Sequence, residues 1–194
     1  SNCNGSVSLE LALKSLGIKN KDEVIVTSKS YFISAACVIN VGAIPVFVDV
    51  DYDSQNISSD EIEKVINKRT KAIICIHLGG LPCDMDKILK IKKKYKLKVI
   101  EDCAQAHGAR FKNKVVGSFG DISCWSFCND KIMNAGEGGM ILTNNIKLYR
   151  KVWTLREGGR DQKAIRRQSN KIGFKYIHES FGTNSRMTEI QAVI

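Results

Sequence analysis

The sequence lacks long apolar runs, and this limits the classes of protein to which it can belong. No stretch approaches the roughly 18 consecutive apolar residues typical of a membrane span, and the first residues carry neither a basic start nor an apolar signal core. The 194 residues include only two prolines and no low-complexity tract. We therefore expect one folded cytoplasmic domain that does not contact a membrane.

Several functional motifs are also missing. The seven cysteines never form a Cys-x-x-Cys pair and the three histidines are scattered, which argues against a metal site. No Gly-x-Gly-x-x-Gly follows an early strand, and no Gly-Lys-Ser/Thr follows the glycine-rich stretch 136–139. Rossmann-type nucleotide binding and nucleoside triphosphate hydrolysis are therefore disfavoured. The apolar neighbours of Cys75 and Cys124 indicate buried thiols, not an oxidising compartment.

The positive charge is spread along helix-like segments. The formal net charge of +10 would permit nucleic-acid binding if it gathered on one surface. In the lysine-rich run 87–98, however, Ile88, Ile91 and Tyr95 recur at near-helical spacing, so the lysines are expected on the outer face of an amphipathic helix. We expect no nucleic-acid partner, although a nucleotide-bearing substrate would benefit from the positive field.

Short β-branched runs alternate with amphipathic stretches, which predicts an α/β fold with strands joined by helical crossovers. Strands are expected at 23–27, 44–48, 71–76, 97–101, 122–127 and 140–143. Helices are expected at 7–16, 32–41, 59–67, 85–95, 146–156 and 187–194. The run 72–76 is apolar throughout, so helices should cover both faces of the sheet. Ligands of such sheets bind beyond the carboxyl ends of the strands.

Three segments place reactive or polar residues at positions of this kind. Glu101 and Asp102 directly follow an apolar strand, and Lys131 follows the next strand within a small-residue loop. Residues 4–6 open the first helix, where free backbone N–H groups and the helix dipole favour a phosphate. Each signal alone has a structural alternative, since acids cap turns, lysines are mostly exposed and Asn, Gly and Ser cap helices.

In order and spacing, these segments resemble the DegT/DnrJ/EryC1/StrS family of sugar aminotransferases, within the aspartate aminotransferase superfamily. The matching motifs lie at 42–49, 101–108, 116–121, 126–131, 137–140 and 184–189. The resemblance implies the three-layer, mostly parallel sheet of a pyridoxal-phosphate-binding large domain over residues 1–194. It also implies that the chain is a fragment of one about twice as long, and that the C-terminal small domain is missing.

The resemblance implies a role for each candidate site residue. As catalytic residues, Lys131 holds pyridoxal 5'-phosphate in a Schiff base and Asp102 faces the nitrogen of its ring. Gln105 hydrogen-bonds the phenolic oxygen of the ring, and Tyr31 stacks on its face. The phosphate is bound by Gly5, Ser6 and Ser126 of one subunit and by Asn184 of its neighbour. The expected assembly is thus a homodimer with a shared active site.

The implied reaction transfers an amino group, with glutamate as the expected donor, to a nucleotide-linked keto-deoxysugar. Its product would enter polysaccharide, O-antigen or glycoconjugate synthesis. Lys131 argues against the dehydratase branch of the family, in which histidine replaces the lysine. A truncated, non-catalytic remnant of the fold is the alternative. In addition, Gly5-Ser6-Val7 replaces the usual Gly-Thr-Ser or Gly-Thr-Ala, which removes one possible side-chain donor to the phosphate.

The remaining candidates receive structural interpretations. Trp125, Phe127 and Met133 are expected in the core, and Glu101 is expected to support the site or to form an ion pair. His77 is assigned no role.

Overall fold

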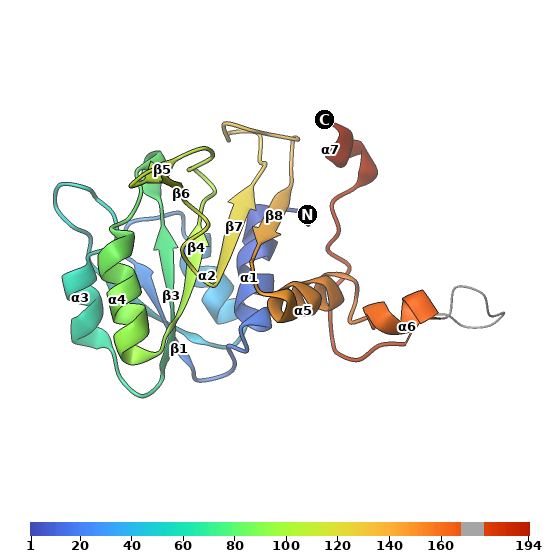
Figure 1. Cartoon of the computed structure of the whole chain (residues 1–194), viewed down its shortest axis with the longest axis horizontal. Helices are drawn as coiled ribbons and strands as arrows, with labels where there is room; N and C mark the ends of the chain where they lie inside the picture. The colour runs from blue at the N-terminus through green and yellow to red at the C-terminus, as the bar shows by residue number, and fades with distance from the viewer. Residues whose placement is uncertain (168–176) are drawn as a thin grey trace.

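The computed structural model describes residues 1–167 and 177–194, which include a six-stranded sheet between helices (Figure 1). Its strands are β1 (Glu23–Thr27), β2 (Ile44–Val48), β3 (Thr70–Ile76), β4 (Lys98–Asp102), β7 (Ile122–Ser126) and β8 (Gly139–Leu142). Their order is β2-β1-β3-β4-β7-β8, and only the β7 and β8 pair is antiparallel. The predicted α/β fold with a mostly parallel sheet is confirmed.

Helices cover both faces of this sheet (Figure 1). One face carries α1 (Gly5–Ser15) and α2 (Ile33–Asn40), with α5 (Ile146–Arg156) beside α1, and the other carries α3 (Ser59–Val65) and α4 (Met85–Tyr95). The remaining elements are η1 (Leu78–Gly80), β5 (Arg110–Phe111), β6 (Lys114–Val115), α6 (Gln162–Arg167) and α7 (Glu189–Val193). None of the described helices is long and apolar enough to cross a membrane.

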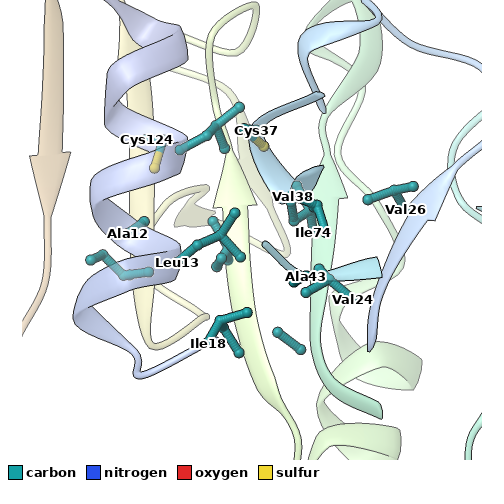
Figure 2. Close-up of a cluster of buried hydrophobic side chains, with 14 of the residues drawn as sticks. Ala12, Leu13, Ile18, Val24, Val26, Cys37, Val38, Ala43, Ile74 and Cys124 are labelled. Atoms are coloured by element: carbon teal, nitrogen blue, oxygen red, sulfur yellow. The ribbon is translucent and has the colours of Figure 1, made fainter. Parts of the chain in front are cut away.

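The central strands are buried on both faces because their alternate side chains enter two different cores. Val24 and Ile74 pack with Leu13 of α1 in the cluster that Figure 2 shows. The side chain of Ile73 points to the opposite face of the sheet and packs with Ile88 of α4. The apolar run 72–76 therefore has no polar face, as the sequence predicted.

Hydrogen bonds at the ends of two helices explain where they differ from the expected bounds. The first helix begins at Gly5, earlier than expected, because the Asn4 side chain accepts a backbone N–H of the first turn. Helix α3 ends at Val65, before the expected residue 67, because Asn67 and Thr70 close a turn with two hydrogen bonds of 3.0 Å.

Short elements at the sheet edge and near the C-terminus were not predicted correctly. The β5–β6 hairpin and α6 are too short for a period to be recognised in the sequence. Helix α7 begins at Glu189, after the expected residue 187. It begins there because Thr188 is its N-cap, and the side chains of Thr188 and Gln191 each accept a backbone N–H of the other residue.

The two-sided core predicts different costs for two similar substitutions. Replacing the fully buried Ile74 with alanine should lower the free energy of unfolding by about 2–5 kcal/mol, through lost burial and a residual cavity. Replacing Ile44, which is 42% exposed on the edge strand β2, should cost clearly less. Urea denaturation of both variants measures the difference, and equal losses would contradict the burial pattern.

Candidate active site

A cavity of about 470 Å³ lies at the carboxyl ends of β3, β4 and β7, beside the start of α1. Of the eight site residues predicted from the sequence, seven line it: Gly5, Ser6, Tyr31, Asp102, Gln105, Ser126 and Lys131. Residues that are far apart in the sequence thus meet at the sheet edge where ligands of parallel sheets bind.

The eighth residue, Asn184, does not line this cavity. It forms an isolated bridge with Glu157, and its Oδ1 accepts a hydrogen bond of 3.1 Å from Nε of Arg186. The role expected for Asn184 was in the site of a neighbouring subunit, and that role stays a prediction.

Asp102 is the last residue of β4 and is only 8% exposed. Burial raises the pKa of its carboxyl group, while the N–H of Ala104, at 3.0 Å from Oδ1, and the nearby His77 and Lys131 oppose the rise. A cation placed against this carboxylate would favour its ionised form further. Asp102 is therefore a group whose protonation responds to what occupies the cavity.

The loop after β7 turns back toward the cavity and carries Lys131 on its wall. The backbone N–H of Lys131 donates to the carbonyl of Cys128 at 3.0 Å, which closes a tight turn. The lysine side chain is 16% exposed, and its Nζ lies 2.9 Å from Oδ2 of Asp130. This hydrogen bond lowers the pKa of the Asp130 carboxyl group. The amine is thus held at the cavity by an acidic neighbour.

The start of α1 and the end of β7 together form an anion-binding corner. Within the described chain, the backbone N–H groups of Gly5 and Ser6 have no hydrogen-bond acceptor, as expected for a first helical turn. Ser126 Oγ accepts the N–H of Cys128 at 3.3 Å, so its own hydrogen is free to donate. A Cβ on Gly5 would lie 2.8 Å from Cβ of Ser126, which explains the glycine. These donors and the helix dipole fit a phosphate.

Gln105 and Tyr31 complete the polar and aromatic lining. The N–H of Gly79 donates to Oε1 of Gln105 at 2.7 Å, which identifies this atom as oxygen and leaves the side-chain amide hydrogens as donors. Tyr31 is 65% exposed and packs edge-to-face on Phe32, with ring centroids 4.8 Å apart. A flat ring in the cavity could therefore contact an amide donor and an aromatic face.

Sequence reasoning missed part of the lining and misplaced one side chain. The unpredicted lining residues include Ser30, Ser34, Cys128, Asn129, Asp130 and Glu137. The predicted core position of Met133 is wrong, because its side chain is 58% exposed in the loop after β7. Trp125 is buried in the core as predicted but also lines the cavity, and Phe127 is half-buried. The nearness of Asp130 to the lysine signature was the signal available for that residue.

Comparisons with known proteins bear on this site. A family model described as the DegT/DnrJ/EryC1/StrS aminotransferase family matches residues 1–194. The chain belongs to this family. The sequence resemblance noted above is therefore confirmed over the whole chain.

Two relatives and two solved structures illustrate the match with this family. The chain is 45% identical over 191 residues to GDP-perosamine synthase of Escherichia coli O157:H7, covering 98% of this chain and 50% of that protein. It is 46% identical to UDP-N-acetyl-3-dehydro-alpha-D-glucosamine 3-aminotransferase of Acidithiobacillus ferrooxidans, with coverages of 98% and 48%. An aminotransferase from Psychrobacter cryohalolentis superposes with a TM-score of 0.95 at 50% identity, with coverages of 99% and 49%.

A structure from Bacillus subtilis with the bound cofactor PMP superposes with a TM-score of 0.85 at 32% identity, covering 98% of this chain and 41% of that one. The chain spans about half the length of the curated relatives it matches.

Because burial raises the pKa of Asp102, the ionised carboxyl group should lower the free energy of unfolding. The folded chain holds this proton more tightly than the unfolded chain, so stability falls as pH rises above the unfolded value of about 3.9. In the cofactor-free protein, Asp102→Asn should therefore raise the urea midpoint at pH 7, and the gain should shrink as pH falls toward 4.

The control for this prediction is Asp86→Asn, at a partly exposed acid on α4 that pairs with Lys112. This variant should change the midpoint little. A loss of stability in Asp102→Asn at pH 7 would contradict the assignment of Asp102 as a desolvated carboxyl group.

Proposed function

We propose that the chain is the cofactor-binding large domain of a pyridoxal-phosphate-dependent aminotransferase that acts on nucleotide-linked keto-deoxysugars. One observation carries the proposal: Asp102, at the end of β4, and Lys131, in the loop after β7, line the same cavity, and the lysine charge acts on the carboxyl group. This chemistry requires an amine and a carboxylate directed at one ligand.

Bound pyridoxal phosphate supplies an aldehyde that bonds reversibly to amines and a ring that accepts electrons. The Nζ of Lys131 would be the amine that holds this aldehyde. When not bonded to the cofactor, Nζ would be the group that accepts and returns a proton at the donor. Asp130, at 2.9 Å, stabilises Nζ whenever it carries a positive charge.

The other lining residues hold and orient the cofactor. Asp102 would keep a proton on the ring nitrogen, Gln105 would donate an amide N–H to the phenolic oxygen, and Tyr31 would cover one ring face. The backbone N–H groups of Gly5 and Ser6 and the hydroxyl of Ser126 bind the phosphate. No basic side chain is assigned to the phosphate, and the helix start provides the positive potential.

The substrate class is supported by the names of the relatives, which include a GDP-perosamine synthase and an aminotransferase of a UDP-linked sugar. The positive net charge is also compatible with a nucleotide diphosphate group. We propose glutamate as the amino donor, synthesis of polysaccharide such as O-antigen as the destination, and a homodimer in which Asn184 reaches the neighbouring site.

A second candidate is a non-catalytic remnant of the same fold. It is favoured by one observation, namely that the chain spans about half the length of its relatives. The two candidates differ in whether the cavity binds the cofactor covalently.

Covalent binding of the cofactor is the first test. The protein is incubated with pyridoxal phosphate, its visible spectrum is recorded, and borohydride is added. We expect a chromophore that reduction fixes on the peptide containing Lys131, as peptide mass spectrometry would detect. Lys131→Ala should abolish the label, and Lys90→Ala, at an exposed lysine of α4, should not. Failure of the unmodified protein to form a chromophore would favour the remnant.

Sharing of the site between subunits is tested by complementation. If Asn184 serves the neighbouring site, Lys131→Ala and Asn184→Ala are each inactive, but a mixed dimer contains one intact site. Random mixing should then restore roughly a quarter of the wild-type sites, measured as amino transfer from glutamate to a nucleotide-linked keto sugar in the full-length protein. Mixtures no more active than the separate variants would exclude a role for Asn184 across the interface.

A further inference from the structure

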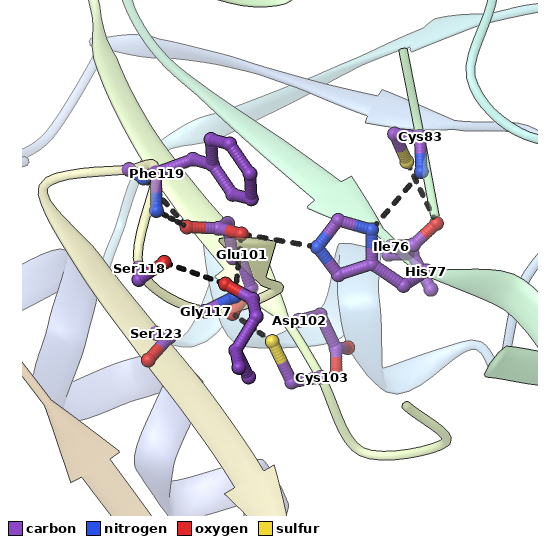
Figure 3. Close-up of polar contacts among 12 residues, drawn as sticks. Ile76, His77, Cys83, Glu101, Asp102, Cys103, Gly117, Ser118, Phe119 and Ser123 are labelled. Carbon is purple, nitrogen blue, oxygen red and sulfur yellow. Dashed lines mark hydrogen bonds and ion pairs between the residues drawn. The ribbon is translucent and has the colours of Figure 1, made fainter. Parts of the chain in front are cut away.

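Glu101 is fully buried on β4, one residue before Asp102, and four donors surround its carboxylate (Figure 3). The donors are the backbone N–H groups of Gly117 at 2.6 Å, Phe119 at 2.7 Å and Gly120 at 2.6 Å, and Nε2 of His77 at 3.2 Å. Burial alone raises the pKa of Glu101, but the hydrogen bonds outweigh it, so the pKa is lowered. The group is therefore held as a carboxylate inside the protein.

His77 contacts both Glu101 and Asp102. Its Nδ1 accepts the backbone N–H of Cys83 at 3.1 Å, so the ring hydrogen lies on Nε2 and is donated to Glu101. The backbone N–H of His77 donates to the carbonyl of Asp102 at 3.1 Å. One residue at the end of β3 thus holds the side chain of Glu101 and the main chain of Asp102.

The two acids point to opposite faces because successive strand residues alternate. Glu101 faces the loop 117–120 and His77, whereas Asp102 lines the cavity. A shift or twist of this strand end would have to break the hydrogen bonds of Glu101. The position of Asp102 is therefore coupled to interactions on the other side of the sheet.

We propose that Glu101 and His77 form a positioning pair that fixes the carboxylate of Asp102 in the cavity. The proposal rests on the function proposed above for Asp102, because it describes how that residue is held against a ligand. Neither member of the pair lines the cavity, so both act through Asp102 and not on the substrate.

A metal site is a weaker explanation of the same cluster. Ligand atoms of His77, Glu101 and Cys103 lie within 4.8 Å of one another. However, each carboxylate oxygen of Glu101 already accepts two hydrogen bonds, and Nδ1 of His77 accepts one. A metal would have to displace several of these bonds, so the hydrogen-bonded pair accounts better for the geometry.

The variants separate positioning from general stability. Glu101→Gln places an amide N–H against backbone donors, and His77→Phe removes both ring partners. His77→Gln retains one donor and one acceptor and serves as the conservative variant. The matched control is Glu23→Gln, at a buried glutamate on β1 that contacts Arg69 at 2.5 Å and Asn67 at 2.7 Å, at the amino end of the sheet.

The measurement is the titration of Asp102, followed by NMR of its labelled side-chain carboxyl carbon in the cofactor-free chain. Loss of the pair should let this carboxyl group reach solvent, so its midpoint should fall toward the ordinary value of about 3.9. His77→Phe is the decisive variant, because His77 itself lowers this pKa, and its removal without a change in the position of Asp102 would raise the midpoint. A fall in Glu101→Gln gives weaker support, because this change also removes a neighbouring negative charge. Glu23→Gln should retain the wild-type midpoint, and His77→Gln should not lower it.

An unchanged or raised midpoint in folded His77→Phe would overturn the proposal. If Glu101→Gln and His77→Phe both fail to fold, nitrogen-15 NMR of the wild-type imidazole decides instead. A hydrogen on Nε2 alone at pH 7 supports the pair, and a hydrogen on Nδ1 overturns it. Both measurements need no cofactor. A chain that binds no pyridoxal phosphate would therefore refute the proposed function while the positioning pair is still tested.

Discussion

A buried carboxylate must be hydrogen-bonded, and at Glu101 this requirement organises the edge of the sheet where the cavity lies. Its four donors come from the end of β3 and from the loop that leads into β7. The strand that bears Asp102 is thereby joined to both of its neighbours at the point where ligands of parallel sheets bind. On the proposed positioning role, the place of Asp102 in the cavity depends on this set of contacts.

Glu101 and Asp102, the two consecutive acids of β4, are both buried but have opposite pKa shifts. Both are desolvated, yet the pKa of Glu101 is lowered and that of Asp102 is raised. The difference lies in their donors: among the described residues, Glu101 receives four hydrogen bonds, whereas the carboxylate of Asp102 receives one, from Ala104. The protein satisfies Glu101 internally and leaves Asp102 available for a ligand.

Local patterns predicted the central strands and marked residues 102 and 131 as candidates that follow strand ends, because apolar runs and strand ends are readable in sequence. The family resemblance supplied their convergence on one ligand and the individual roles of Gln105 and Tyr31. Neither source predicted the contact between His77 and Glu101, which are 24 residues apart in the sequence. This contact depends on the register between β3 and β4 and on which ring nitrogen of His77 carries the hydrogen, and a sequence shows neither. The exposed position of Met133 was missed because its loop leaves the sheet, and apolar character alone does not reveal that path.

The charges of the cavity lining are compatible with the proposed sharing of the site between subunits. Its acids are Asp102, Asp130 and Glu137, and among the described lining residues Lys131 is the single lysine or arginine. That lysine is already paired with Asp130 and is assigned to the cofactor. A donor such as glutamate brings carboxylates, which bind best to positive groups. On the proposed function, these groups would lie beyond the described lining, and the proposed homodimer, in which Asn184 reaches the neighbouring site, would be one source of them.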